Sequence, residues 1–372
     1  MSKILITGSN GFIGSNLKFR LVELGYVCIE FKKEDRLSEI EDILTDIDFI
    51  YHLAGVNRSL KSNDFFEGNS DLTRRLLELI KQKKLSIPII FSSSIQAECE
   101  NAYGKSKKLA EQSIFEYSKG TGAPVAVYRL PNIFGKWSKP DYNSFIATFC
   151  HNISRGLPIK IDNKDSIVDL VYIDDLVDEF VEMLQNGWND TNQTYFTPKV
   201  RYSKSVGEVA EKIHFFNKNR SHKDLLVTSV GCGFDRALYA TFTSFLEKDN
   251  FSYSLTKHED ERGVFAEFLK TEKSGQVSIF TAYPGVKRGG HYHRTKSEKF
   301  FVLKGSMLFR FRNILSGEIV EYEIADNEFR VVETPVGWAH SIENIGKEVA
   351  IALVWANEIF DKNNPDTTVF DV

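Results

Sequence analysis

The sequence is poor in cysteine, has no marked excess of either charge, and contains no apolar stretch long enough to span a bilayer. Its cysteines stand far apart and form no CxxC pair: Cys28, Cys99, Cys150 and Cys232. This spacing argues against a disulfide framework and favours reduced thiols in the cytoplasm. The net charge of -4, without a basic run interleaved with aromatics, gives nucleic-acid binding little support. No charged leader with a cleavage site precedes the first apolar run, so we expect a cytoplasmic protein without membrane or nucleic-acid partners.

The first part of the chain alternates short apolar runs with helical patterns. A chain of 372 residues is too long for one ordinary domain. Strands are predicted at 3–7, 26–31, 48–54, 88–93 and 124–130. Helical patterns lie between them, including the segments around 72–84 and 104–118. This alternation predicts an α/β fold built on a Rossmann-type, doubly wound parallel sheet.

The pattern changes near residue 250, where short alternating runs separated by turn signals replace the helices. Strands are predicted at 276–282, 299–304, 307–312, 318–323, 329–333 and 349–355. Regular short strands with little helix predict an all-β sandwich or barrel. The charged segment 244–252 is the candidate linker, so we expect one domain over 1–245 and another over 252–372.

A glycine-rich turn lies between the first predicted strand and the first predicted helix. Gly8, Gly11 and Gly14 form a GxxGxxG pattern there. Such a turn lets a pyrophosphate approach the backbone and the positive end of the helix. Glu30 ends the second predicted strand, and Lys32 and Lys33 follow it. The lysines favour a ribose 2′-phosphate and therefore NADPH, although they also fit a solvated charged loop.

Tyr103 and Lys107 stand four residues apart, so a helix would present both on one face. A lysine ammonium beside a phenol lowers the pKa of the tyrosine, which makes Tyr103 a usable acid for a ketone oxygen that receives a hydride. Ser94, at the end of the strand over 88–93, can hydrogen-bond the same oxygen. An isolated YxxxK pair is usually a surface pair, but its position after a strand that ends in serines favours catalysis.

These segments together resemble the extended short-chain dehydrogenase/reductase family, whose members often act on nucleotide sugars. The resemblance covers roughly the first 240 residues and rests on TGSNGFIG (7–14), DFIYHLAG (48–55), FSSSI (91–95), YGKSK (103–107), RLPNIFG (129–135) and VDLVYIDD (168–175). It implies that Ser94, Tyr103 and Lys107 are catalytic. The stretch between Ser94 and Tyr103 is short for this family, so Ser92 and Ser93 remain alternatives to Ser94.

The same resemblance implies the binding residues. Together with the glycine turn and the lysines after the second strand, it places the cofactor against a set of residues that includes His52 and the following turn: Gly8, Gly11, Phe12, Ile13, Gly14, Lys32, His52, Leu53, Ala54, Gly55, Tyr103 and Lys107. It places the nucleotide sugar against Asn132 and Arg129.

A second set of chemical residues lies near the end of the chain. His291, His293 and Glu298 form HxHxxxxE, and His340 follows in PxGxxH. Two histidines that are two apart on a strand share a face. Three imidazoles and one carboxylate suit a divalent metal, for which zinc fits best and manganese, iron or nickel remain alternatives.

This spacing resembles the cupin barrel. Gly285 and Gly305 match the first cupin motif with the HxH pair, and Pro335, Gly337 and Asn344 match the second, whose opening glycine is replaced by Phe329. Upstream, DERGVFAEF (260–268) and RGGHYH (288–293) resemble the dTDP-4-keto-6-deoxyhexose epimerases, with Asp260, Arg262 and Glu267 matching their pattern. Those enzymes use the histidine of RGxHY as a base, a position that His291 fills here as an expected metal ligand.

The order of the two parts resembles bacterial capsular polysaccharide enzymes in which an extended reductase is fused to a metal cupin. HLAGVNR (52–58), SSSIQA (92–97), FGKW (134–137), YNSFIATFC (142–150) and NEIFDKNNPDT (357–367) carry this resemblance. It implies a homodimer that acts on a UDP-linked 4-keto-6-deoxy amino sugar, epimerising C-3 and then reducing the C-4 ketone with NADPH. Two alternatives are a reductase whose cupin is a structural or dimerisation module, and an NADPH-binding redox sensor without turnover.

Overall fold

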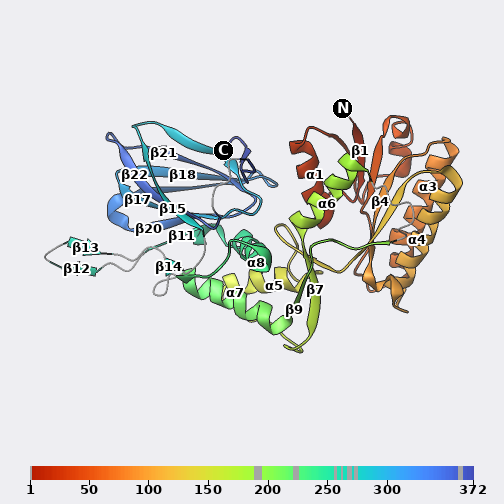
Figure 1. Ribbon diagram of the computed structural model, residues 1–372, viewed down its shortest axis with the longest axis horizontal. Helices are drawn as coiled ribbons and strands as arrows, with labels where there is room; N and C mark the ends of the chain where they lie inside the picture. Colours follow the sequence, from red (N-terminus) through yellow and green to blue (C-terminus); the bar gives the residue numbers. More distant parts are fainter. Residues whose placement is uncertain are drawn as a thin grey trace. The chain divides into compact units, whose positions relative to one another are not determined.

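The computed structural model describes residues 2–187, 195–220, 226–254, 258–260, 263–265, 270–271, 275–358 and 363–372. The chain forms two compact units, Met1–Ile133 with Asp169–Ser203, and Phe134–Val168 with Lys204–Val372 (Figure 1). No helix in the described ranges combines the length and apolarity needed to cross a membrane. All four cysteines are described, and each is a free thiol.

The first unit is a parallel sheet of six strands in the order β2-β1-β3-β4-β5-β8. The strands are β1 (Lys3–Thr7), β2 (Val27–Phe31), β3 (Phe49–His52), β4 (Ile89–Ser94), β5 (Val125–Leu130) and β8 (Tyr195–Phe196). The first five match the predicted strands to within a few residues. The apolar side chains of β1, β3 and β4 are all buried because helices cover both faces of the sheet, whereas Val27 of the edge strand β2 is exposed.

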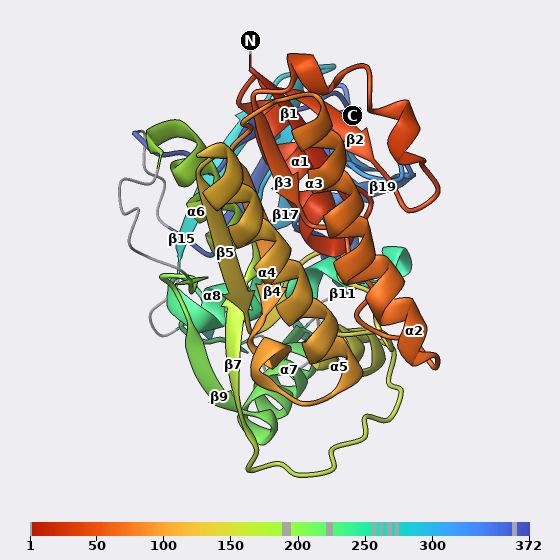
Figure 2. The same cartoon turned by 90° about the vertical axis from the view of Figure 1, so that its right-hand side faces the viewer.

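Helices α3 (Leu72–Gln82) and α4 (Ala102–Thr121) lie side by side on one face of this sheet (Figure 2). A single apolar cluster joins Leu76 and Ile80 of α3 to Ile114 and Tyr117 of α4 and to strand residues such as Ile89. Helices α1 (Phe12–Glu23) and α6 (Ile173–Asn186) pack against each other. The predicted doubly wound sheet is therefore confirmed.

Short elements complete the connections of the first unit. They are η1 (Leu37–Glu39), η2 (Leu44–Asp46), α2 (Ser62–Phe65), the π-helical turn η3 (Phe66–Asp71) and η4 (Ile95–Glu98). A small sheet in the order β6-β7-β9 contains the points where the chain passes between the units: β6 (Asn132–Phe134), β7 (Ile167–Tyr172) and β9 (Tyr202–Ser205).

The second unit contains two antiparallel sheets of five strands. One has the order β11-β20-β17-β22-β15, with bounds Ser252–Ser254, Arg330–Thr334, Glu298–Lys304, Ala350–Ala356 and Gln276–Ala282. The other has the order β19-β18-β21-β16-β23, with bounds Ile319–Ala325, Ser306–Asn313, Trp338–Asn344, Lys287–Tyr292 and Thr368–Val369. The predicted all-β C-terminal part is confirmed, but no pairing among the described strands joins the two sheets into a closed barrel.

Three helices belong to the same compact unit as these sheets: α5 (Phe145–Ser154), α7 (Val206–Arg220) and α8 (Gly233–Ser244). Minor elements are η5 (Lys248–Asn250), η6 (Asp326–Glu328), the hairpin β12 (His258–Asp260) and β13 (Gly263–Phe265), and the pair β10 (Leu226–Val227) and β14 (Lys270–Thr271). The three helices contact one another, and α7 reaches β20 through a buried ion pair between Arg220 and Glu333. The domain division at 245–252 remains a prediction.

Candidate active sites

The glycine turn between β1 and α1 is too tight for side chains. Gly8 has φ +71°, and a Cβ on it would lie 2.9 Å from the backbone of Ala54. A Cβ on Gly14 would lie 2.1 Å from the carbonyl oxygen of Gly8. Gly11 caps α1 without any side chain to occupy the helix N-terminus. The turn therefore has the open backbone and the helix end that a pyrophosphate requires.

A buried network joins this turn to the end of β3. The hydroxyl of Thr7 accepts hydrogen bonds from the backbone N–H groups of Leu53 (3.2 Å) and Ala54 (3.1 Å). His52 lies between Thr7 Oγ1 (2.7 Å from Nδ1) and Thr73 Oγ1 (2.8 Å from Nε2). Burial, helped by the charge of Lys107, lowers the pKa of His52 to about 3. A neutral His52 thus holds the predicted cofactor-binding segment against the glycine turn.

Tyr103 and Lys107 both lie on α4, as predicted, and Ser94 ends β4. Ser94 hydrogen-bonds the Tyr103 phenol, which tends to lower the pKa of Tyr103, but burial outweighs this effect and raises the pKa. Lys107 donates to the backbone carbonyl of Ser92 at 2.9 Å. Burial lowers the pKa of Lys107 to about 8. The prediction of a lowered tyrosine pKa is wrong for this structure, because burial dominates and Lys107 is bound to a carbonyl.

The three serines at the end of β4 have different partners. Ser94 pairs with Tyr103, whereas the Ser93 hydroxyl donates to the carboxylate of Glu111. The Ser92 hydroxyl is 3.5 Å from the carbonyl of His52. The contact with Tyr103 favours Ser94 over its neighbours as the catalytic serine, a role that stays a prediction.

A short connection brings α4 against η4. A Cβ on Gly104 would lie 2.1 Å from the carbonyl oxygen of Gln96, so glycine is required where the two elements touch. Asn101 caps α4 by accepting from the Gly104 N–H at 2.7 Å. The brief stretch between Ser94 and Tyr103 therefore still allows the serine and the tyrosine to meet.

Asn69 belongs to this site although the sequence patterns did not single it out. Its amide accepts from Val56 N and donates to Val56 O, both at 2.9 Å, and it also donates to Ser106. A Cβ on Gly55 would lie 2.7 Å from Asn69 Oδ1 and 3.1 Å from Lys107 Nζ. Asn69 lies in the π-helical turn η3, and such turns are frequent at functional sites.

The two predicted sugar contacts lie on either side of the β5 end. Arg129 makes a two-pronged ion pair with Glu111, at 3.0 and 2.8 Å, and its guanidinium stacks 3.6 Å from the centre of the Tyr195 ring. Asn132 begins β6 and is exposed. Their contacts with a sugar remain predictions.

Charged side chains surround the expected ribose position at the end of β2. Both carboxylate oxygens of Glu30 are 3.3 Å from Lys18 Nζ, and Lys32 Nζ is 4.0 Å from one of them. The side chain of Lys32 is 37% exposed, so it is free to meet a ligand. NADPH fits these charges, and its preference over NADH remains a prediction.

The expected metal ligands converge between the two sheets of the second unit. His291 lies on β16, His293 directly follows it, His340 lies on β21, and Glu298 begins β17 of the other sheet. The ligand atoms lie within 4.8 Å of one another. Nε2 of His293 and Nε2 of His340 are 3.2 and 3.4 Å from the same Glu298 oxygen, Oε2.

A bulge in β16 produces this convergence. The register of β16 on β21 shifts between Gly289 and His291, so that His291 pairs with His340. Gly289 and Gly290 both have positive φ, +93° and +74°, which favours glycine. Without the extra residue His291 would turn to the opposite face of the sheet.

The electrostatics of the four ligands suit a cation. Burial, together with the other two histidines, lowers the pKa of His291 to about 4, and burial also lowers the pKa of His340. Burial acts to raise the pKa of Glu298, but its contacts with His293 and His340 lower it well below the usual value. Three imidazoles beside a carboxylate form the donor set that zinc prefers, so the residues fit the metal.

The cupin and epimerase resemblances also singled out Phe329, Asp260, Arg262 and Glu267, of which the structure describes only Phe329 fully. Phe329 has φ +52°, so it adopts the left-handed conformation of the glycine that it replaces. Of the epimerase-like residues, Arg262 and Glu267 lie outside the described residues, and Asp260 is described only as part of the β12 backbone.

Known proteins match the whole chain. Residues 4–196 match the NAD dependent epimerase/dehydratase family, and residues 258–368 match the polysaccharide biosynthesis C-terminal domain. The chain is 47% identical to a UDP-2-acetamido-2,6-beta-L-arabino-hexul-4-ose reductase of Pseudomonas aeruginosa, over 98% of this chain and 97% of that protein. The crystal structure of the capsular polysaccharide assembling protein CapF from Staphylococcus aureus matches with a TM-score of 0.67 and 38% identity, over 99% of this chain and 100% of that one.

A more distant structure supports the fold of the first part alone. UDP-glucuronic acid 4-epimerase from Bacillus cereus, in complex with NAD, is 22% identical, with a TM-score of 0.53 over 58% of this chain and 83% of its own. The resemblance to capsular polysaccharide enzymes that fuse a reductase to a second domain is confirmed by the full-length matches. The chain belongs to the NAD dependent epimerase/dehydratase family and carries a polysaccharide biosynthesis C-terminal domain.

Proposed function

We propose that this chain is a bifunctional nucleotide-sugar enzyme. Its metal unit epimerises C-3 of a UDP-2-acetamido-2,6-dideoxy-4-ketohexose, and its reductase unit reduces the C-4 ketone to give UDP-2-acetamido-2,6-dideoxy-L-talose. That product lies on the route to UDP-N-acetyl-L-fucosamine for capsule or O-antigen. The full-length relative that is named for reduction of a UDP-linked 4-keto sugar supports the substrate class. The proposal rests above all on one observation, that a Ser–Tyr–Lys site and a His₃Glu cluster occur in one chain.

The reductase step follows from the contacts around Tyr103. NADPH bound at the glycine turn would supply the hydride for C-4. Tyr103, whose phenol stays protonated because burial raises its pKa, donates the proton to the ketone oxygen. The hydroxyl of Ser94, bonded to that phenol, orients the same oxygen. The ammonium of Lys107 donates to the Ser92 carbonyl at 2.9 Å, which fixes the end of β4 from which Ser94 reaches the phenol.

The epimerisation step needs a stabilised enolate. A divalent metal held by His291, His293, Glu298 and His340 would act as a Lewis acid for the C-4 ketone, which acidifies the C-3 proton. The four side chains would hold that metal from both sheets. Loss of the C-3 proton and its return to the opposite face inverts that carbon without any net oxidation.

A second candidate function is a one-step reductase whose C-terminal unit is a structural or dimerisation module. The name of the full-length relative, which mentions only reduction, favours it. In either case we expect a homodimer, which sedimentation of the purified protein tests directly.

Proton NMR in deuterated buffer separates the two functions. With the UDP-linked 4-keto-6-deoxy-N-acetyl sugar and no NADPH, the bifunctional enzyme incorporates deuterium at C-3. Addition of NADPH then yields the talo-configured product. A His340→Ala variant should lose the exchange and retain NADPH binding, whereas Tyr103→Phe should retain the exchange and lose reduction. Reduction by the wild type without C-3 exchange would establish the one-step reductase instead.

A further inference from the structure

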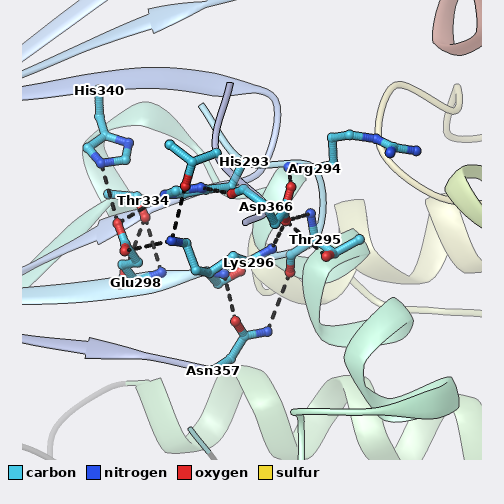
Figure 3. A network of polar contacts seen from close by, with 11 residues as sticks. His293, Arg294, Thr295, Lys296, Glu298, Thr334, His340, Asn357 and Asp366 are labelled. Atoms are coloured by element: carbon cyan, nitrogen blue, oxygen red, sulfur yellow. Dashed lines mark hydrogen bonds and ion pairs between the residues drawn. The ribbon is translucent and has the colours of Figure 1, made fainter. Parts of the chain in front are cut away.

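The loop between the metal ligands His293 and Glu298 is held in place by residues near the C-terminal end of the chain. Residues 294–297 connect His293 to Glu298, so their conformation sets the separation of two metal ligands. Asp366 lies beside this loop, far away in sequence but close in space (Figure 3).

The carboxylate of Asp366 gathers the N–H groups of this loop. Its Oδ1 accepts from Arg294 N at 2.9 Å, and its Oδ2 accepts from Thr295 N and Lys296 N, each at 2.7 Å. The hydroxyl of Thr295 donates to Oδ2 as well, at 2.9 Å. One ionised carboxylate therefore organises three consecutive backbone donors, and hydrogen bonds to a charged acceptor are strong ones.

The backbone carbonyl of Asp366 acts on a metal ligand directly. It is hydrogen-bonded to Nδ1 of His293. A carbonyl oxygen can only accept, so Nδ1 must carry the proton. Nε2 of His293 then points at Glu298 Oε2, 3.2 Å away, with a lone pair or a second proton. With a lone pair on Nε2, a divalent cation shared with Oε2 would hold this pair together, as in a metal-bound histidine oriented by a carbonyl.

The remaining N–H group of the loop has a separate partner. Ser297 N donates to Asn357 Oδ1 at 2.9 Å, and the amide of Asn357 also approaches the Thr295 carbonyl at 3.4 Å. In the C-terminal tail, residues 363–372, the hydroxyl of Thr367 lies 3.5 Å from Lys296 Nζ. Lys296 Nζ in turn lies 3.5 Å from Glu298 Oε1. The loop is thus held from two sides, and Asp366 holds the side nearer His293.

The tail stays docked by contacts that do not involve the Asp366 side chain. β23 pairs with β16 at His291 and Tyr292, and Phe370 N donates to Gly290 O at 2.9 Å. The ring of Phe370 packs against that of Tyr292, with 5.8 Å between centroids. A change confined to the Asp366 carboxylate should therefore leave the tail and the sheet in place.

We propose that Asp366 is a positioning residue for the metal centre: its carboxylate sets the 294–297 loop and its carbonyl sets the tautomer and direction of His293. The inference rests on the metal site proposed above and deepens it. Asp366 touches neither the substrate nor the metal, and it acts through His293 and Glu298. It follows that the last residues of the chain are part of the metal site.

Metal affinity of the full-length protein tests this role without any activity assay. Metal is removed with a chelator, and Zn²⁺ binding is measured by competition with a chromophoric chelator, with Co²⁺ absorption reporting ligand geometry. In Asp366→Asn an amide N–H₂ group faces backbone N–H donors, so Zn²⁺ affinity should fall about 10- to 100-fold and the Co²⁺ spectrum should change. Asp371→Asn is the matched control, since it removes the same charge from the exposed tail and should leave Zn²⁺ affinity within about twofold of the wild type.

Circular dichroism and NADPH binding establish that each variant is folded. If Asp366→Asn fails to fold, Asp366→Glu replaces it in the test. The glutamate keeps the charge but carries its carboxylate one methylene further from the backbone, so Zn²⁺ affinity should also fall. A folded Asp366→Asn or Asp366→Glu variant with wild-type Zn²⁺ affinity and an unchanged Co²⁺ spectrum would overturn the positioning role while leaving the metal site intact. A wild-type protein that binds neither ion would overturn the metal site together with this inference.

Discussion

Gly289 lies against the backbone carbonyl of His340, so closely that a Cβ on Gly289 would be 2.8 Å from that oxygen. Gly289 also has φ +93°, a conformation that side-chain-bearing residues rarely adopt. Its missing side chain lets β16 approach β21 where the bulge brings His291 opposite His340. The metal cluster therefore depends on a residue that carries no functional group.

Replacing Gly289 with alanine should damage the metal centre. The added methyl group forces β16 away from β21, and the left-handed backbone costs about 1–3 kcal/mol. We expect Zn²⁺ affinity at least tenfold weaker than in the wild type, measured on metal-stripped protein, together with a lower free energy of unfolding.

Gly317→Ala is the control for backbone strain. Gly317 has φ +74°, and a Cβ there would meet no described atom within 4 Å. This variant should lose only the cost of the left-handed backbone, about 1–3 kcal/mol, and keep wild-type Zn²⁺ affinity. Equal Zn²⁺ affinity in the two variants would contradict the role of the close approach.

The features that the sequence predicts well are those that local patterning encodes. Strand β15 coincides with the predicted 276–282, and the strands of the parallel sheet follow their apolar runs. The glycine turn, the YxxxK helix and the four metal ligands also follow from spacing along the chain. Each of these signals lies within a short segment or a recognisable motif.

The features that the sequence could not predict depend on distant contacts. Asn69 and Asp366 act through partners that only the folded chain brings near them. The raised pKa of Tyr103 results from burial, which the YxxxK pattern does not reveal. Phe329 adopts a glycine-like φ of +52° at the end of η6, although its side chain disfavours that conformation.

The pH dependence of ketone reduction should report Lys107. Burial lowers the pKa of Lys107 to about 8, so its ammonium is lost as the pH rises through that value. The phenol of Tyr103 stays protonated over the same range because its pKa is raised. We expect kcat/KM for reduction to be constant below about pH 8 and to fall above it, since this parameter reports the free enzyme.

A Lys107→Arg variant identifies the group responsible. The guanidinium stays protonated throughout, so any residual reduction by this variant should lack the alkaline decline. A wild-type profile that remains flat through the same range, or an unchanged decline in Lys107→Arg, would assign the pH dependence to another group.

Cofactor preference should depend on the two lysines after β2. Lys32 is partly exposed beside Glu30, and a 2′-phosphate there would add an ion pair worth about 1 kcal/mol per exposed lysine. A Lys32→Ala/Lys33→Ala variant should therefore bind NADPH roughly 5- to 30-fold more weakly. Titration with NADH is the internal control, because it lacks the 2′-phosphate and its affinity should not fall. An equal loss for both cofactors would instead indicate damage to the site.

A buried ion cluster centred on Glu333 stabilises the second unit. Arg220 of α7 and Lys299 of β17 both pair with Glu333 of β20, and the three side chains are 8%, 3% and 3% exposed, in that order. Burial acts to raise the pKa of Glu333, but the two cations lower it, so the carboxylate is ionised. Glu333→Gln would leave two buried cations without a counter-ion, and we expect a loss of about 3–5 kcal/mol in the free energy of unfolding.

Glu318→Gln makes the same chemical change in an exposed ion pair. Lys248 and Glu318 are 49% and 41% exposed, so water solvates the lysine when its partner is neutralised, and the loss should be at most about 1 kcal/mol. Denaturant unfolding of both variants gives the comparison. Similar losses of unfolding free energy in the two variants would show that water reaches the Glu333 cluster and that the cluster does not stabilise the packing of α7 on the sheet. A large difference would mean that residues 252–372 alone lack part of their own core, because the cation of Arg220 reaches Glu333 from outside that range.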